Sequence, residues 1–361
     1  MTSQIARLND FGQSPWYDNI THTLVTGGGL AALVRDDGIR GVTSNPTIFE
    51  KAIAGGEGYD DAIAAAKTAG DSIEDTFWDL AVRDVGGAAD VLAPVHDGVG
   101  GRDGFVSIEV SPLLAHDTEA TVAQAAALWA RLDRPNIMIK IPATPEGIPA
   151  IARTIAAGIN VNVTLIFSLA RYADVMEAYQ TGLEQLDAAG GDITSVHSVA
   201  SFFVSRVDTE ADKRLAPDSP LRGKPAVANA KLAYEAYRAT FAGARWEALA
   251  GAHLQRPLWA STSTKNPAYD PILYVDTLIG PDTVNTLAPA SIDALHAPGV
   301  DLRADTVTEG VAEAHQVMAD LATAGVSFDD ITDTVEREGV ASFAKSYTDL
   351  LATLKTRAAA L

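Results

Sequence analysis

Residues 136–167 read NIMIKIPATPEGIPAIARTIAAGINVNVTLIF, and this stretch determines the expected fold. Its two ends, 136–141 and 160–167, are short runs rich in isoleucine and valine. The residues between them, 148–157, are rich in alanine and carry apolar residues at helical spacing. A strand, a helix and a second strand in this order are typical of a βαβ unit, whose strands run parallel.

The same alternation of short strands and longer helices runs along the whole chain, which predicts an α/β fold around a parallel sheet. Helices are expected at 118–132, 148–157 and 168–189. Strands are expected at 15–20, 41–48, 104–110, 136–141, 160–167, 196–204, 256–262 and 283–287. Since no linker rich in proline, glycine or serine divides the chain, we expect residues 1–361 to form one (β/α)8 TIM barrel domain.

Two regions exceed what such a barrel needs. One follows the second strand, at about 59–96, and reads as inserted helices. The other is the C-terminal tail, where 307–324 and 331–354 are amphipathic. We therefore expect additional helices in both places.

The net charge of the chain argues against some classes of binding partner. Its 361 residues include 27 basic and 47 acidic side chains, so the formal net charge is −20. Such acidity argues against nucleic acids and anionic membranes as partners, because both select clustered lysine and arginine. A small anionic substrate is still compatible, since it needs only a local cationic pocket.

Several absences in the sequence exclude further classes. The chain has no cysteine, which excludes disulfides, thiolate zinc sites and cysteine nucleophiles. The seven histidines are scattered without a ligand spacing, so no metal site is expected. We find neither a signal peptide pattern nor a stretch of about 18 uninterrupted apolar residues. A soluble cytoplasmic protein is therefore expected.

Polar side chains interrupt the apolar strands at alternate positions, although buried parallel strands usually read as nearly continuous apolar runs. These polar residues are Thr43, Asn45, Ser107, Glu109, Asn136, Lys140, Asn162, Thr164, Ser168, Ser261 and Ser263. Because alternate residues of a strand share a face, these groups can point into one lumen, while neighbours such as Val163 and Leu165 face the helices. The pattern predicts a site inside the barrel.

Lys140 lies within the apolar run 136–141 and is the only lysine between Lys67 and Lys213. A buried lysine is costly unless it is paired, and burial favours the neutral amine. A neutral amine attacks carbonyl carbon, so one interpretation is a nucleophile that forms a Schiff base. The other is a lysine at the end of a strand that extends to a carboxylate at the rim. The local sequence does not decide between them.

Glu109 lies in an apolar strand that is expected to neighbour the strand of Lys140. Imine formation moves protons on and off the carbinolamine oxygen, and a nearby carboxyl group can carry them directly or through a water. The alternative is a structural ion pair with Lys140 that only neutralises both charges. We favour the functional interpretation, because a buried ion pair is weak evidence for a stabilising role.

Six segments together resemble the transaldolase family. They occur in the family's order and spacing across most of the chain, at 41–49 (GVTSNPTIF), 106–110 (VSIEV), 139–144 (IKIPAT), 160–168 (NVNVTLIFS), 201–206 (SFFVSR) and 257–261 (PLWAS). The length and the insertion after strand 2 resemble the longer bacterial subgroup. The resemblance implies cofactor-free class I Schiff-base chemistry on sugar phosphates.

The resemblance also implies a reaction and its catalytic residues. A dihydroxyacetone unit passes from sedoheptulose 7-phosphate or fructose 6-phosphate to glyceraldehyde 3-phosphate or erythrose 4-phosphate, in the non-oxidative pentose phosphate pathway. Lys140 corresponds to the Schiff-base lysine. Glu109 corresponds to the carboxylate that moves protons with Thr164 and a bound water. Asp18 corresponds to the aspartate that takes the hydroxyl proton as the carbon–carbon bond breaks.

Further residues match the family's contacts to the sugar. Asn45 and Asn162 correspond to the amides that hold the dihydroxyacetone hydroxyls and the enamine. Ser201 opens one of the matching segments and is expected to contact the substrate as well.

The substrate phosphate is expected to bind Arg206 and Ser261, which match the family's phosphate site. The alternative for Arg206 is a salt bridge with Asp208 or Glu210 on the following helix. The family usually has a second arginine soon after the serine, whereas residues 261–265 of this chain read STSTK. Lys265 is therefore expected to act in its place as a point charge.

Two other functions are compatible with these residues. A fructose-6-phosphate type of class I aldolase would use the same lysine but release free dihydroxyacetone. A non-catalytic barrel that only binds sugar phosphates would keep Lys140 and Glu109 as a structural pair. The sequence leaves the oligomeric state as a monomer or a homodimer.

Overall fold

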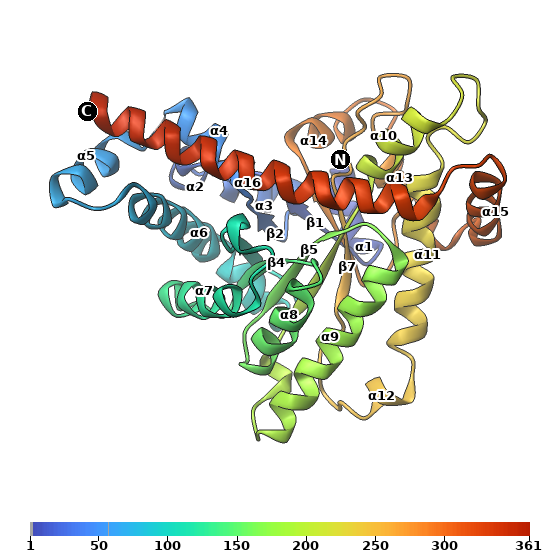
Figure 1. Cartoon of the computed structure of the whole chain (residues 1–361), viewed down its shortest axis with the longest axis horizontal. Helices are drawn as coiled ribbons and strands as arrows, with labels where there is room; N and C mark the ends of the chain where they lie inside the picture. The colour runs from blue at the N-terminus through green and yellow to red at the C-terminus, as the bar shows by residue number, and fades with distance from the viewer. Residues whose placement is uncertain (1–2, 57) are drawn as a thin grey trace.

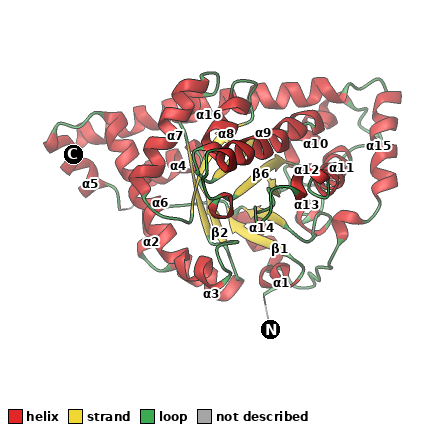
Figure 2. Cartoon of the chain, turned by 90° about the horizontal axis from the view of Figure 1, so that it is seen from below, coloured by secondary structure: helices red, strands yellow, loops and turns green. Residues whose placement is uncertain are grey.

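Eight strands form a closed parallel barrel. The computed structural model describes residues 3–56 and 58–361. Each strand pairs with its neighbours in chain order, and β1 pairs with β8 to complete the ring (Figures 1 and 2). The strands are β1 (Gln13–Tyr17), β2 (Gly41–Thr43), β3 (Phe105–Glu109), β4 (Ile137–Pro142), β5 (Val161–Ile166), β6 (Ser198–Phe203), β7 (Arg256–Ala260) and β8 (Thr283–Leu287). The predicted (β/α)8 barrel is therefore confirmed.

Helices surround this barrel, as Figure 2 shows. The α-helices are α1 (Gln4–Asp10), α2 (His22–Thr26), α3 (Gly29–Asp37), α4 (Pro46–Gly55), α5 (Asp60–Ala69), α6 (Ile73–Gly98), α7 (Thr118–Leu132), α8 (Gly147–Ala156), α9 (Leu169–Ala188), α10 (Ser205–Arg214), α11 (Pro225–Thr240), α12 (Ala244–Glu247), α13 (Leu273–Asp276), α14 (Pro289–Leu295), α15 (Val311–Thr323) and α16 (Phe328–Ala360). The 3-10 helices are η1 (Pro112–Leu114), η2 (Ile193–Ser195) and η3 (Thr306–Thr308). The additional helices expected after strand 2 and in the tail are confirmed.

The prediction of a strand at 41–48 is wrong for its second half. β2 ends at Thr43, and Pro46 begins α4. Asn45 caps this helix, because its side-chain oxygen accepts a hydrogen bond of 3.0 Å from the backbone N–H of Ile48. Pro46 occupies the first turn, where a helix needs no N–H donor. The cap therefore overrides the strand-like alternation.

β5 departs from regular alternation at Leu165. The φ of Leu165 is 60°, in the left-handed region, and the register with β6 shifts between Val163 and Ile166. Ser168 consequently lies outside the lumen and caps α9, accepting a hydrogen bond of 3.1 Å from the Arg171 N–H. The prediction that Ser168 belongs to the lumen is wrong.

Asn136 also serves the scaffold rather than the predicted site. Its amide donates hydrogen bonds to the carbonyl groups of Ala89 and Gly104, at 2.9 and 3.0 Å. The side chain thus ties β4 to α6 and to the residue just before β3. The polar pattern alone does not separate this role from a lumen position.

The register of the middle strands aligns three polar residues. Glu109 on β3 pairs with Lys140 on β4, and Lys140 pairs with Asn162 on β5. Paired residues of neighbouring strands face the same side of a sheet, so a polar row crosses three strands and reaches the carboxyl end of β3 at Glu109. This is the end at which barrel enzymes carry their sites.

α16 crosses one end of the barrel and is the long red helix of Figure 1. It packs against α4, α5, α6 and α10. The hydroxyl groups of Thr47 and Ser346 lie 2.8 Å apart and join α4 to α16. The tail expected at 331–354 therefore forms a longer helix that lies over the barrel.

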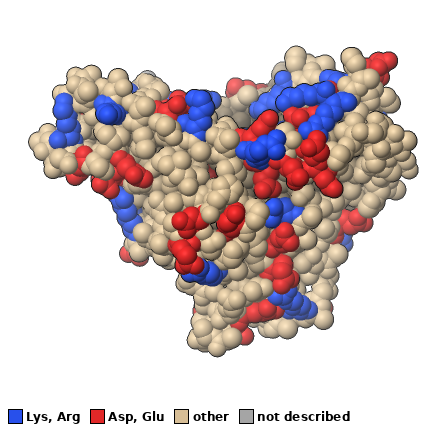
Figure 3. Space-filling model, in the orientation of Figure 1, with Lys and Arg blue, Asp and Glu red and all other residues tan. Residues whose placement is uncertain are grey.

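The exterior carries acidic and basic side chains beside one another over the face shown in Figure 3. None of the helices in the described part of the chain is long and apolar enough to cross a membrane.

We expect Gly41→Ala to lower the free energy of unfolding by about 1–3 kcal/mol. Gly41 on β2 pairs with the buried Trp16 on β1, and a methyl group added at Gly41 would overlap the indole ring. Urea unfolding measures the change. The control is Gly98→Ala at the end of α6, where an added methyl meets open space and should change stability by less than about 0.5 kcal/mol. Equal effects would contradict the packing argument.

Candidate active site

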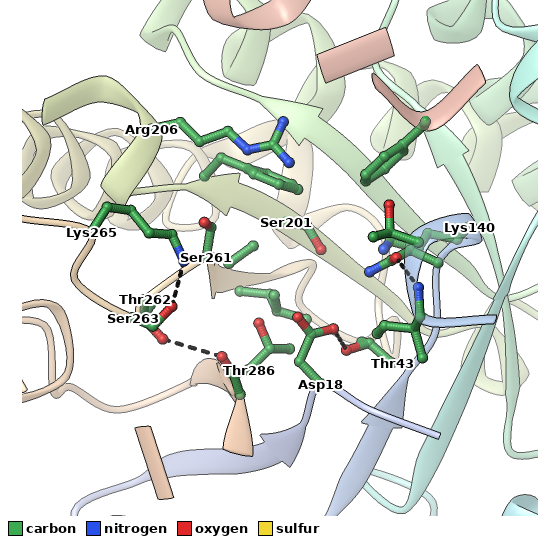
Figure 4. A pocket seen from close by; sticks show the side chains of 18 of the residues that line it. Asp18, Thr43, Lys140, Ser201, Arg206, Ser261, Thr262, Ser263, Lys265 and Thr286 are labelled. Carbon is green, nitrogen blue, oxygen red and sulfur yellow. Dashed lines mark hydrogen bonds between the residues drawn. The ribbon is translucent and has the colours of Figure 1, made fainter. Parts of the chain in front are cut away.

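A cavity of about 210 Å³ opens at the carboxyl ends of the strands. The residues predicted from the sequence that line it are Asp18, Thr43, Asn45, Lys140, Ser201, Arg206, Ser261, Ser263 and Lys265. Figure 4 shows Lys140 on one side of the cavity and both Arg206 and Lys265 on the other. Glu109, Asn162 and Thr164 are buried next to this cavity rather than on its surface.

Lys140 is almost completely buried and lies beside Glu109. Its Nζ is 3.5 Å from Glu109 Oε2, and each side chain has an exposed fraction of 5%. The ammonium group also donates a hydrogen bond of 3.3 Å to the carbonyl oxygen of Ser44. The amine therefore faces the cavity with a carboxyl group at its back.

Burial raises the pKa of Glu109 from 4.5 to about 7, although the positive charge of Lys140 opposes the rise. Glu109 Oε2 and Thr164 Oγ1 are buried and have no hydrogen-bond partner among the described residues. A carboxyl group with a pKa near neutrality can both give and take a proton. These two oxygens can therefore act on a water or on a substrate hydroxyl.

Asn162 links three strands below the cavity. Its amide nitrogen donates a hydrogen bond of 3.0 Å to Ser107 Oγ. Its carbonyl oxygen accepts one of 2.7 Å from the Ser201 hydroxyl, and Ser201 lines the cavity. The network fixes the orientation of both the amide and the serine.

Asp18 follows β1, and its N–H donates to the Leu287 carbonyl of β8 at 2.9 Å. The carboxylate accepts a hydrogen bond of 2.6 Å from the Thr43 hydroxyl, as Figure 4 shows. Asn45 lines the same cavity, and its carbonyl oxygen is occupied by the helix cap, so it can offer its amide donors to a ligand.

The opposite side of the cavity is cationic. Arg206 lies in the first turn of α10, and it makes no ion pair with Asp208 or Glu210 within the described residues. Lys265 follows β7, and its Nζ donates a hydrogen bond of 2.7 Å to Ser263 Oγ. Desolvation first, and repulsion by Arg206 second, lower the pKa of Lys265. Two repelling cations at one side of a cavity favour an anionic ligand between them.

Ser261 also belongs to this cationic side. Its φ is 56°, a left-handed conformation that is uncommon for serine. Its hydroxyl lies 3.0 Å from the Ser205 hydroxyl at the start of α10. The strand end thus turns sharply and presents Ser261 beside Arg206.

Comparison with known proteins identifies the family. The sequence pattern of the transaldolase/fructose-6-phosphate aldolase family matches residues 15–354. A protein of Streptomyces avermitilis named transaldolase 1 is 52% identical over 98% of this chain and 95% of its own length. The chain belongs to this transaldolase family. Transaldolases of Saccharopolyspora erythraea and Thermobifida fusca are each 50% identical over 97% of their own lengths, and over 98% and 97% of this chain.

The resemblance to transaldolases found in the sequence is thus confirmed, and with it the transaldolase activity. Sequence reasoning nevertheless missed several residues that line the cavity in this transaldolase, and two of them bear on its cations. Lys51 of α4 lines it as a further cation. Phe343 of α16 places its ring 6.0 Å from Lys140 Nζ and 5.8 Å from Arg206 Cζ.

These two residues, Lys51 and Phe343, differ in whether the sequence near them could have predicted their place in the cavity. Lys51 follows the matched motif at 41–49 by two residues, so its closeness to that motif could have suggested it. Phe343 has no such signal, because only the path of α16 across the barrel brings it to the cavity.

We expect Glu109→Gln to change how stability depends on pH. Since the folded state holds the Glu109 proton more tightly than the unfolded chain, this carboxyl group costs stability as pH rises from about 4.5 to about 7. Glutamine has no such cost. Urea unfolding at about pH 5 and about pH 8 should therefore show the variant gaining stability relative to the parent at the higher pH. The same difference at both pH values would refute the raised pKa.

Proposed function

We propose that Lys140 is the nucleophile with which this transaldolase captures a ketose phosphate. The observation that supports this most directly is the buried amine, which faces the cavity 3.5 Å from Glu109 and across from the cationic side. A ketose phosphate has its carbonyl at one end and its phosphate at the other. The cavity has the amine at one side and the cations at the other, so a ketose phosphate fits with its carbonyl toward Lys140.

The first chemical step joins the amine to the carbonyl. The neutral amine of Lys140 adds to the ketone carbon, and one proton passes from its nitrogen to the oxygen. The oxygen takes a second proton from protonated Glu109 and leaves as water, which gives a protonated imine. Glu109 and Thr164 are proposed to move these protons through a bound water. The raised pKa of Glu109 supports that role, as do the buried oxygens Glu109 Oε2 and Thr164 Oγ1, which have no hydrogen-bond partner among the described residues.

The second step breaks the carbon–carbon bond. Asp18 takes the proton of the C4 hydroxyl, the C3–C4 bonding electrons pass to the imine, and an aldose phosphate leaves. A three-carbon enamine stays on Lys140. The hydrogen bond from Thr43 supports this role because it orients the Asp18 carboxylate. The reverse steps join the unit to an acceptor aldose phosphate, and water then hydrolyses the imine.

The remaining residues are proposed to hold the substrate. Asn45, Asn162 and Ser201 would bind the hydroxyls of the three-carbon unit. Arg206, Ser261 and Lys265 would bind the phosphate. We infer that the donors are sedoheptulose 7-phosphate or fructose 6-phosphate, and that the acceptors are glyceraldehyde 3-phosphate or erythrose 4-phosphate.

Aldol cleavage with release of dihydroxyacetone is the second candidate reaction, because the description of the matching family also includes fructose-6-phosphate aldolase. The two reactions differ in their need for an acceptor. Free dihydroxyacetone formed from fructose 6-phosphate alone would favour the aldolase.

We expect borohydride with fructose 6-phosphate to attach a sugar fragment to Lys140. Lys140→Arg keeps the charge but cannot form the imine, so both the adduct and the transfer activity should disappear. Peptide mass spectrometry locates the adduct. Lys67→Arg, at an exposed lysine of α5, is the matched control and should retain both. An adduct on another lysine of the parent protein would rule out the proposed nucleophile.

We expect Asp18→Asn to separate imine formation from bond cleavage. An amide cannot take the C4 hydroxyl proton, so kcat should fall by about 100-fold or more. The imine should still form. Borohydride should therefore trap the whole six-carbon phosphate in the variant and a three-carbon fragment in the parent. A three-carbon adduct at the parental rate in the variant would assign the base to another group.

A further inference from the structure

The segment that carries Lys265 has no regular structure. It runs from the end of β7 to the start of α13 and contains Ser261, Ser263, Lys265 and Tyr269. Neither sheet pairing nor a helix therefore fixes where the ammonium group lies. Side-chain contacts of the segment must do so.

Tyr269 in this segment and Tyr274 in α13, which follows it, both bond to one helix. The hydroxyl of Tyr274 donates to Asp208 Oδ2 at 2.8 Å, and both residues are 1% exposed. The hydroxyl of Tyr269 donates to Asp212 Oδ2. Both carboxylates belong to α10, the helix whose first turn carries Arg206. The same helix thus carries Arg206, which is one cation of the cavity, and the carboxylates that anchor the chain around Lys265, which is the other.

The two carboxylates are themselves held in place. Asp208 Oδ1 accepts a hydrogen bond of 2.8 Å from the N–H of Ala226, at the start of α11. Asp212 Oδ1 accepts one of 3.2 Å from the N–H of Gly223. Gly223 also lies against the ring of Tyr269, where an added side chain would come within 2.8 Å. The anchors are therefore fixed to the scaffold on both sides.

Lys265 lies between two cavities. The second one, of about 340 Å³, is lined by Lys265 together with both tyrosines and both aspartates. Arg206 repels Lys265 from the active-site cavity. The second cavity holds charges of both signs, because Lys213 and Arg222 line it as well and Arg222 lies 3.8 Å from Asp212 Oδ2. Without a restraint, an empty phosphate site would let the lysine turn away.

We propose that the Tyr269–Asp212 and Tyr274–Asp208 hydrogen bonds position Lys265 beside Arg206 for the substrate phosphate. The tyrosine hydroxyls bond to carboxylates that are themselves fixed to the scaffold. They also tie its segment to the helix of Arg206. This inference rests on the phosphate-binding role proposed for Lys265.

The test removes one hydroxyl and keeps the ring. In Tyr269→Phe, KM for fructose 6-phosphate should rise about 3- to 10-fold while kcat stays within about twofold. Inhibition by inorganic phosphate should weaken by the same factor. Transfer from unphosphorylated fructose should be unchanged, because it makes no use of the phosphate site. Tyr274→Phe should act in the same direction.

The matched control is Tyr234→Phe on α11, whose hydroxyl donates to the Pro281 carbonyl at 3.1 Å and does not line the active-site cavity. It should leave all these values unchanged. Lys265→Met should also raise KM and weaken phosphate inhibition. In that background Tyr269→Phe should have no further effect on KM, since the lysine it positions is gone.

The possible failures are distinguishable. If Lys265→Met raises KM but neither tyrosine variant does, the positioning role is wrong and the role of Lys265 stands. If Lys265→Met changes neither KM nor phosphate inhibition, Lys265 does not bind the phosphate. The positioning role of the tyrosines is then wrong as well. An equal loss of kcat with phosphorylated and unphosphorylated donors in Tyr269→Phe would show a general structural role, which overturns the positioning proposal.

Discussion

The buried pair of Lys140 and Glu109 is the constraint on which the rest of the site depends. Removing two charges from water is expensive, and at 3.5 Å their attraction offsets only part of that cost. The register of β3 with β4 keeps the pair together, because it places the two residues side by side. The barrel walls that enforce this closeness also desolvate the carboxyl group. The raised pKa that suits Glu109 to proton transfer is thus a consequence of closing the sheet into a barrel.

The remaining groups come from the ends of other elements. Asp18 follows β1, Asn45 precedes α4, and Arg206 begins α10. The scaffold holds Asp18 through the hydrogen bond from Thr43, and Asn45 through its cap on Ile48. Chemistry on a long sugar chain needs groups several ångströms apart. A ring of strand ends supplies them without requiring any one loop to span the cavity.

Much of the fold was predictable because its signals are local. Alternation of strands and helices gave the barrel, and the bounds of β8 agree with the predicted 283–287. The left-handed Leu165 was not predictable, because leucine gives no sign of that conformation, and so Ser168 was misplaced.

The residues of the candidate site also differ in whether a local pattern in the sequence predicts them. Lys140 and Glu109 stood out as charges in apolar strands, whereas Asp18 and Lys265 rested on family resemblance alone. Phe343 reaches the cavity only through the long path of α16, and no pattern near it in the sequence records that contact. The Tyr269 and Tyr274 anchors also depend on pairing between distant segments.

The cationic side of the cavity lies in a chain whose net charge is −20, and this contrast acts on the kinetics of substrate capture. At a distance an anionic sugar phosphate meets the repulsion of the whole molecule, and only within about one Debye length does the local attraction of Arg206 and Lys265 prevail. Dissolved salt screens the long-range repulsion as well as the local attraction. Ionic strength consequently hastens the encounter while it shortens the lifetime of the bound state.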